Sequence, residues 1–240
     1  MEFALKGDKD EKMVQEIKTI NLGGVNCYLV RTDAGYILID TGFSNKRTRL
    51  EKELESAGCK PGNLKLVVIT HGDSDHTGNG VYLRERYGAR IAMHQDDSGM
   101  VIRGDMGWNR KPRPDKMHFI FRVMMNLLPF FANVDEFDTF QPDLTIDEDF
   151  DLSEYGFDAK ILHLPGHSNG SIGIFTPEGD LYCGDLLYNF IGKPGCLYIN
   201  DLADFNSSIE KLKSLKINTV YPGHGKPFPM EWFIKNYRLP

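Results

Sequence analysis

The chain has 240 residues, of which 41% are hydrophobic and 26% charged, and its formal net charge is −6. This length and composition allow one substantial buried core, which excludes a disordered chain and gives no reason to assume a second domain. The acidic balance leaves no broad basic surface, so we expect no nucleic-acid partner.

The N-terminal stretch MEFALKGDKDEKMVQ is too charged for a secretory signal, and no run of about 18 apolar residues follows it. The cysteines lie far apart and form no CxxC pair, which fits reduced thiols better than a disulfide framework or a zinc knuckle. They are Cys27, Cys59, Cys183 and Cys196. We therefore expect a cytoplasmic protein without stable membrane insertion.

Short apolar, β-branched runs recur along the chain and predict buried strands. They cover residues 26–30, 36–39, 66–70, 90–93, 161–164, 172–176, 181–183 and 219–221. Helices are predicted between some of them, at 45–57, 81–87 and 206–215. Because several strands follow one another before a helix intervenes, two mixed sheets fit better than a doubly wound sheet. The predicted fold class is α/β, a four-layer α/β/β/α sandwich of two mixed β-sheets flanked by helices, in one domain over residues 1–240.

The segment from about 98 to 149 departs from this pattern, and we interpret it as a lid-like insertion. It begins with a basic run that contains Arg103, Arg110, Lys111, Arg113 and Lys116. Such runs are more often solvated loops than binding patches, and we interpret this one as solvated. The apolar run 118–131 that follows is too short to span a bilayer comfortably. It predicts a core helix, a contact in a homodimer, or a lid over an apolar substrate pocket.

A dense group of potential ligands follows the apolar run 65–70. The stretch HGDSDHTG places His71, Asp73, Asp75 and His76 within six residues. Alone, it also fits an Asx-rich turn that caps the next helix. Three later apolar runs, however, end in a glycine followed by another ligand-type residue, namely His167, Asp185 and His224. Since a cation makes crowded carboxylates tolerable, these turns together predict a metal site.

The ordered set HGDSDH, PGH, CGD and PGHG resembles the signature of the metallo-β-lactamase superfamily over nearly the whole chain. The resemblance implies two divalent metal ions, one bound by His71, Asp73 and His167, the other by Asp75, His76 and His224, with Asp185 bridging both. It also implies that a hydroxide shared by the metals attacks an electrophilic carbon or phosphorus. The segments 24–30 and 37–42 resemble the superfamily's opening hairpin, which makes Asp40 a support for the site rather than a ligand.

Asp73 departs from the family pattern, because the superfamily usually has a histidine at this position. Zinc is the metal implied by the family, whereas the additional carboxylate makes iron or manganese plausible. The superfamily's flavo-diiron proteins also carry an acidic residue here. We expect no flavin-binding module after His224, so a redox role would need a separate electron donor.

Tyr188 lies where related lactonases place a tyrosine that can hydrogen-bond the developing oxyanion, although a packing role is the alternative. Tyr188 and Asp75 are our candidate catalytic residues. The predicted function is hydrolysis of an ester, thioester or lactone-type carbonyl of a small molecule, with residues 119–131 suited to an apolar group. Glyoxalase II is close in its motifs, but we expect no counterpart of its C-terminal glutathione-recognition region after His224, which puts glutathione specificity in doubt. The alternatives are a small-phosphodiester hydrolase, a diiron redox protein and a non-catalytic metal-binding module.

Overall fold

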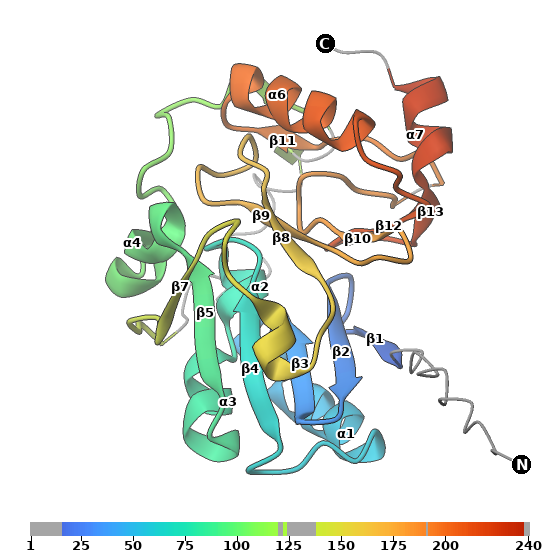
Figure 1. The fold of residues 1–240 in the computed structure, drawn as a ribbon. Helices are drawn as coiled ribbons and strands as arrows, with labels where there is room; N and C mark the ends of the chain where they lie inside the picture. The colour runs from blue at the N-terminus through green and yellow to red at the C-terminus, as the bar shows by residue number, and fades with distance from the viewer. Residues whose placement is uncertain (1–15, 120–121, 124–137, 191, 238–240) are drawn as a thin grey trace, which may run out of the picture.

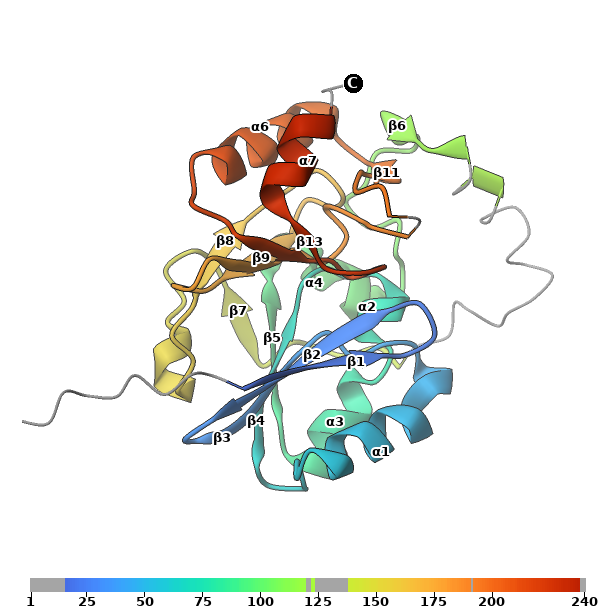
Figure 2. The ribbon, with the colours of Figure 1, turned by 90° about the vertical axis from the view of Figure 1, so that its right-hand side faces the viewer.

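Two β-sheets pack face to face and carry helices on their outer faces (Figures 1 and 2). This computed structural model describes residues 16–119, 122–123, 138–190 and 192–237. Both sheets contain parallel and antiparallel pairs. The predicted four-layer α/β/β/α sandwich is confirmed.

The first sheet has the strand order β1-β2-β3-β4-β5-β7. Its strands are β1 (Ile17–Asn21), β2 (Asn26–Thr32), β3 (Gly35–Ile39), β4 (Leu64–Ile69), β5 (Arg90–His94) and β7 (Leu144–Ile146). The first three are antiparallel, and the pairs from β3 to β7 are parallel. Helices α1 (Arg47–Ser56) and α3 (Gly80–Tyr87) cover its outer face (Figure 2). The short helix α2 (Ser74–Thr77) follows β4, and α4 (Gln95–Arg103) follows β5.

The second sheet has the strand order β13-β12-β10-β9-β8. Its strands are β8 (Lys160–His163), β9 (Ile172–Phe175), β10 (Asp180–Tyr182), β12 (Thr219–Tyr221) and β13 (Phe228–Pro229). Helices α6 (Leu202–Lys213) and α7 (Met230–Asn236) cover its outer face. A separate two-stranded ribbon joins β6 (Lys116–Met117) to β11 (Tyr198–Ile199). Two short 3-10 helices, Ser44–Lys46 and Leu152–Tyr155, complete the described elements.

Side-chain alternation along the central strands explains why both faces of the first sheet are buried. In β3, Leu38 belongs to the cluster that includes Leu50 and Leu54 of α1, whereas Ile37 and Ile39 belong to the cluster between the sheets. A third cluster joins the second sheet to α6 and α7. Successive strand residues point to opposite faces, so continuous apolar runs are the sequence pattern of such a doubly covered sheet.

All eight predicted strands and all three predicted helices are present, with shifted ends. The segment 98–149 is less separate from the sandwich than expected, because 98–103 belong to α4 and 144–146 form β7. Most of the apolar run 118–131 lies outside the described residues, so its lid, dimer and core interpretations stay predictions. Within the described ranges, the helices are too short or too polar to cross a bilayer.

Candidate metal centre

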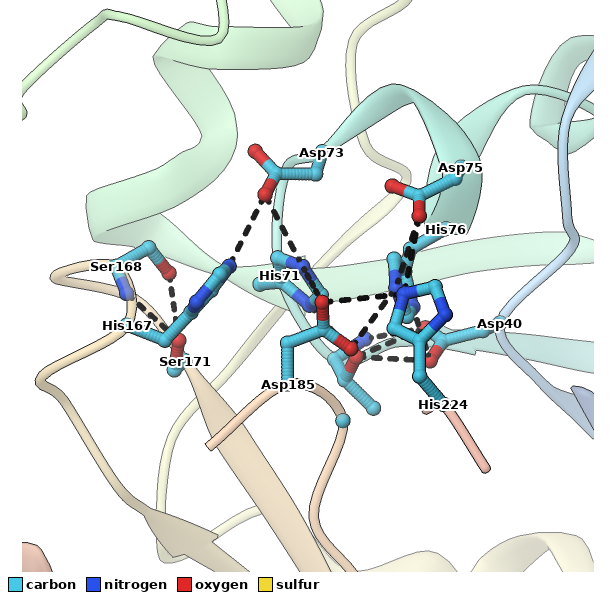
Figure 3. Close-up of polar contacts among 12 residues, drawn as sticks. Asp40, His71, Asp73, Asp75, His76, His167, Ser168, Ser171, Asp185 and His224 are labelled. Atoms are coloured by element: carbon cyan, nitrogen blue, oxygen red, sulfur yellow. Dashed lines mark hydrogen bonds and ion pairs between the residues drawn. The ribbon is translucent and has the colours of Figure 1, made fainter. Parts of the chain in front are cut away.

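Four loops at the carboxyl ends of strands bring the predicted ligands together (Figure 3). The loop after β4 and helix α2 supply four of the side chains, and the loops after β8, β10 and β12 supply the other three. Strands β8, β10 and β12 run in the same direction, so their carboxyl ends meet at one edge of their sheet. The seven side chains are His71, Asp73, Asp75, His76, His167, Asp185 and His224.

One triplet of ligand-type atoms consists of His71, Asp73 and His167, whose atoms lie within 4.8 Å of one another. Oδ2 of Asp73 lies 3.0 Å from Nε2 of His167 and 3.4 Å from Nε2 of His71. We call these three residues the first triplet. They are the same three residues that the family resemblance groups around one metal.

The second triplet consists of Asp75, His76 and His224. Oδ2 of Asp75 lies 3.1 Å from Nε2 of His224 and 3.8 Å from Nε2 of His76. Asp185 lies between the triplets, with Oδ1 3.2 Å from Nε2 of His76 and Oδ2 3.9 Å from Nε2 of His71. The arrangement therefore allows one carboxylate to reach both triplets.

Three of the imidazoles are held through Nδ1, so that Nε2 faces the cluster. Nδ1 of His76 donates to Oδ2 of Asp40 at 2.8 Å, and Nδ1 of His224 donates to the carbonyl oxygen of Gly24 at 2.9 Å. Nδ1 of His71 lies 3.0 Å from the Thr70 hydroxyl oxygen. A hydrogen bond at one ring nitrogen fixes the orientation and tautomer that leave the other free to bind a cation.

Several buried polar atoms at the centre of the cluster form no hydrogen bond. They include Nε2 of His71, Nε2 of His76 and Oδ1 of Asp185. Buried polar atoms in native proteins are normally paired, and an unpaired one carries a desolvation cost. The unpaired atoms point at one another across short distances, and their nitrogen and oxygen chemistry suits Zn²⁺ or Fe²⁺. The residues therefore fit the pair of divalent ions that the sequence implies.

The electrostatics of the cluster also favour a cation. Burial opposes ionisation of Asp185, but the rings of His224 and His76 outweigh it and hold its pKa well below the usual value. Burial likewise opposes protonation of His224, yet Asp185 and Asp75 raise its pKa to about 10. Burial opposes protonation of His76 too, but Asp185 and Asp40 raise its pKa, so protons on His76 and His224 balance the carboxylates, and a cation that binds here would displace them.

Asp40 braces the second triplet from behind, as expected. It has a φ of 58°, in the left-handed region where Asp and Asn are the most tolerated non-glycine residues. Its Oδ1 accepts a hydrogen bond from the Thr70 backbone N–H at 2.8 Å, while Oδ2 accepts from the Thr70 hydroxyl and from His76. The carboxylate thereby ties the end of β4 to the ring of His76.

Asp97 of α4 braces the first triplet, although no motif in the sequence marks it. The carboxylate is buried and accepts hydrogen bonds from the backbone N–H groups of Gly72 and Gly170 at 3.0 and 2.7 Å. It also accepts from the Ser168 hydroxyl at 2.6 Å. Gly72 separates His71 from Asp73, and Ser168 follows His167, so Asp97 joins the two loops that carry this triplet.

Arg110 is a second residue at the centre that no motif in the sequence marks. The interpretation of the basic run as solvated is wrong here, because the Arg110 side chain is only 11% exposed. Its Nη1 lies 2.7 Å from Oδ1 of Asp73, and its Nη2 donates to Oδ2 at 3.0 Å. Burial opposes ionisation of Asp73, but this guanidinium, with His167 and His71, holds its pKa well below the usual value.

Tyr188 lies beside the second triplet, where its ring stacks on His224 with centroids 5.5 Å apart. Its hydroxyl donates to Oδ2 of Asp185 at 2.9 Å. Burial, and then the carboxylate of Asp185, raise its pKa well above the usual value, so the hydroxyl keeps its proton. The candidate catalytic tyrosine therefore donates a hydrogen bond within the cluster.

Gly223 shows why a glycine precedes His224. A Cβ atom at this position would lie 2.4 Å from Oδ1 of Asp185 and 2.7 Å from Cε1 of His76. Both contacts are closer than real Cβ atoms show, and both neighbours are fixed by other contacts. The PGH motif thus provides the space in which the loop after β12 can approach the other ligands.

A third histidine-containing group, made of His94, Asp96 and His163, lies outside the motif. The two imidazole rings stack in parallel, with centroids 4.2 Å apart and planes inclined by 8°. Lone pairs in two parallel planes cannot both point at one ion. The observed geometry therefore suits a packed ring pair better than a metal site.

Comparison with known proteins places the chain in a family. The family model described as the metallo-beta-lactamase superfamily matches residues 20–224. Hydroxyacylglutathione hydrolase GloC of Haemophilus influenzae is 29% identical over 166 residues, 68% of this chain and 66% of that protein. Acyl-coenzyme A thioesterase MBLAC2 of Bos taurus is 28% identical over 232 residues, 86% of this chain and 75% of that protein.

The solved structure of TTHA1623 in a di-iron-bound form superposes with a TM-score of 0.61 at 24% identity, covering 92% of this chain and 97% of that one. This likeness shows a shared fold. The chain spans 57%, 66% and 60% of the length of three of the curated relatives that it matches. The length matched by the family model, residues 20–224, includes all seven ligand-type side chains.

Proposed function

The chain belongs to the metallo-β-lactamase superfamily, and from this premise we propose that it is a binuclear metal-dependent hydrolase of small thioesters, esters or lactones. One observation carries the proposal: six ligand-type side chains form two triplets, and a seventh, Asp185, groups with His71 of the first and His76 of the second. Within each of these groups the ligand atoms lie within 4.8 Å of one another. Buried imidazole nitrogens and carboxylate oxygens without a hydrogen-bond partner are atoms that a bound pair of metal ions would satisfy.

Seven residues would bind the metal ions, and two residues, one of them also a ligand, would take part in proton transfer. His71, Asp73 and His167 would hold one cation, Asp75, His76 and His224 the other, and Asp185 both. Bound divalent ions supply an acidified water and polarise the electrophilic carbonyl. Zinc and iron both suit this mixed set of imidazoles and carboxylates, and one structural relative is described as di-iron-bound.

Asp75 of the second triplet and Tyr188 beside it are placed to move protons. Asp75 is partly exposed and lies 3.1 Å from Nε2 of His224, so its carboxylate can accept a proton from an incoming water. The Tyr188 hydroxyl, protonated at neutral pH, can donate to the oxygen that gains charge when the carbonyl is attacked. These roles make Asp75 and Tyr188 the proposed catalytic residues.

Thioesters lead the substrate classes for two reasons. Two of the matched relatives are named for thioester substrates, a hydroxyacylglutathione hydrolase and an acyl-coenzyme A thioesterase. The Phe190 ring, 49% exposed, lies against His224 with centroids 5.5 Å apart and provides an apolar wall beside the second triplet. An acyl chain can pack on such a surface while its carbonyl reaches the centre.

The test pairs metal analysis with a panel of electrophiles. Purified protein should contain up to two zinc or iron ions per chain and hydrolyse an acyl-coenzyme A or glutathione thioester faster than a lactone or bis-p-nitrophenyl phosphate. Asp185→Asn should lose most of both metals and at least about a hundredfold in turnover, because the carboxylate reaches both triplets. Metal-loaded protein inert on every carbonyl substrate, or full metal occupancy in Asp185→Asn, would refute the proposal.

A further inference from the structure

The first triplet differs from the second in having a cation already in contact with one of its ligands. The Arg110 guanidinium faces both oxygens of Asp73, at 2.7 and 3.0 Å. Among the described residues, it is the only lysine or arginine whose ion pair reaches one of the seven ligand-type side chains. The second triplet has the opposite neighbour, since the Asp40 carboxylate lies 2.8 Å behind His76.

Arg110 is held in place by contacts on either side of it. The carbonyl oxygen of Asn109, whose φ is 57°, accepts a hydrogen bond from the Asn169 side chain at 2.7 Å. On the other side, the Lys111 backbone N–H donates to the Asn200 side chain at 2.9 Å. The guanidinium also lies over the Tyr198 ring, 5.5 Å from its centroid. These contacts fix the position of Arg110, so its contact with Asp73 does not depend on a mobile, exposed side chain.

We propose that Arg110 weakens cation binding at the first triplet by competing for Asp73, so that the two triplets fill in order, the second before the first. The inference rests on the proposed two-metal function. The guanidinium gives Asp73 one hydrogen bond, at Oδ2, and an ion-pair contact at Oδ1, and a cation must share or displace these charge-assisted contacts. Asp73 and Arg110 together also carry no net charge, which makes the pair the electrostatic equivalent of the neutral histidine usual in the family.

The size of the effect follows from the contact that the cation must displace. A hydrogen bond to a charged group contributes enough free energy that giving it up weakens cation binding by at least about tenfold. The pairing with Asp73 is therefore the property to change. Arg110→Gln keeps polar atoms near Asp73 and removes the charge, whereas Arg110→Lys keeps the charge and removes the planar pair of N–H donors.

The experiment measures zinc affinities by competition with a chromophoric chelator on protein stripped of metal. Wild type should bind two Zn²⁺ per chain in two resolved steps. Arg110→Gln and Arg110→Met should each tighten the weaker step at least about tenfold and tighten the stronger step by a smaller factor. Arg110→Lys should stay close to wild type. The matched control is Arg113→Met, an exposed arginine of the same loop, which should change neither step.

A double substitution tests whether Arg110 competes with the cation for Asp73 or only positions Asp73. With Asp73→His in place there is no carboxylate for Arg110 to compete for, and adding Arg110→Gln should no longer tighten the weaker step by tenfold. The inference is overturned if Arg110→Gln leaves that step unchanged or weakens it, since Arg110 would then only position Asp73. Protein that binds no Zn²⁺ at either step would instead defeat the two-metal function itself.

Discussion

The two halves of the candidate centre use the same kinds of ligand but are braced by opposite charges. The first triplet is backed by the guanidinium of Arg110 on Asp73, and the second by the carboxylate of Asp40 on His76. A carboxylate behind an imidazole increases its basicity as a ligand, whereas a guanidinium on a carboxylate withdraws negative charge from it. Residues outside the ligand motif can thus give two similar triplets different affinities.

The braces also come from different parts of the chain. Asp40 follows β3, directly beside β4 in the first sheet, so its place is fixed by the pairing of two core strands. Arg110 comes from the loop between α4 and β6, which reaches the centre through contacts with Asn169 and Asn200. The residue that supports the second triplet is therefore held by the paired strands of the first sheet. The residue that supports the first triplet is held by a loop that contacts other loops.

The largest effect that would sharpen this comparison is expected from Asp40→Asn. Asparagine tolerates the left-handed backbone, but its amide cannot accept from both Thr70 and His76 as the carboxylate does. Substitutions behind metal-bound histidines typically cost 10- to 100-fold in metal affinity, so the tighter zinc step should weaken by about that factor. Chelator competition measures it, with Asp33→Asn in the exposed hairpin turn as the control.

An equal loss in both zinc steps of Asp40→Asn would break the comparison, since the two halves would then respond as one unit. Unchanged affinity would show that the contact with His76 has no part in binding. In either case the assignment of Asp40 to the second triplet alone would be wrong.

A smaller effect, on the other half, is expected from Asp97→Asn. The amide would present N–H groups to the donors of Gly72, Ser168 or Gly170, and one buried donor would lose its partner. We expect the free energy of unfolding, measured with denaturant, to fall by about 1–3 kcal/mol. The zinc affinity of the weaker binding step should fall by about tenfold. Asp96→Asn, on the neighbouring and exposed residue, is the matched control. If only the tighter step lost zinc affinity, the assignment of Asp97 to the first triplet would be wrong.

The difference between the halves also explains which parts were predictable from sequence. Each of the seven ligand-type residues follows an apolar run and sits in a short motif, so local pattern was enough to find them. Arg110 and Asp97 meet their partners across 25 to 73 positions of sequence. The sequence around these two residues contains no ligand motif and no hydrophobic periodicity that would mark them. Only the packing of α4 and of the loop after it brings them to the centre.

Several of the elements that were not predicted have similar physical causes. Strands β6, β11 and β13 are two residues long, too short for alternation to be visible. Helix α4 contains Gly99, which lowers its helix propensity. Helix α6 begins at Leu202, four residues earlier than predicted, because Asp201 caps it by accepting from the N–H groups of Ala203 and Asp204. That last signal, an Asp before the apolar run, was present in the sequence.

The smallest expected effect concerns chemistry rather than metal binding. Tyr188→Phe removes a hydroxyl that donates to Asp185 but leaves the ring stacked on His224. Turnover should fall by about tenfold, the worth of one hydrogen bond to a charged group, while both zinc steps stay within about twofold of wild type. Steady-state kinetics should place the loss in kcat rather than KM, because the donor acts on charge that develops during the reaction. Unchanged kcat would remove Tyr188 from the mechanism, and a weakened zinc step would make it a brace of the second triplet, like Asp40.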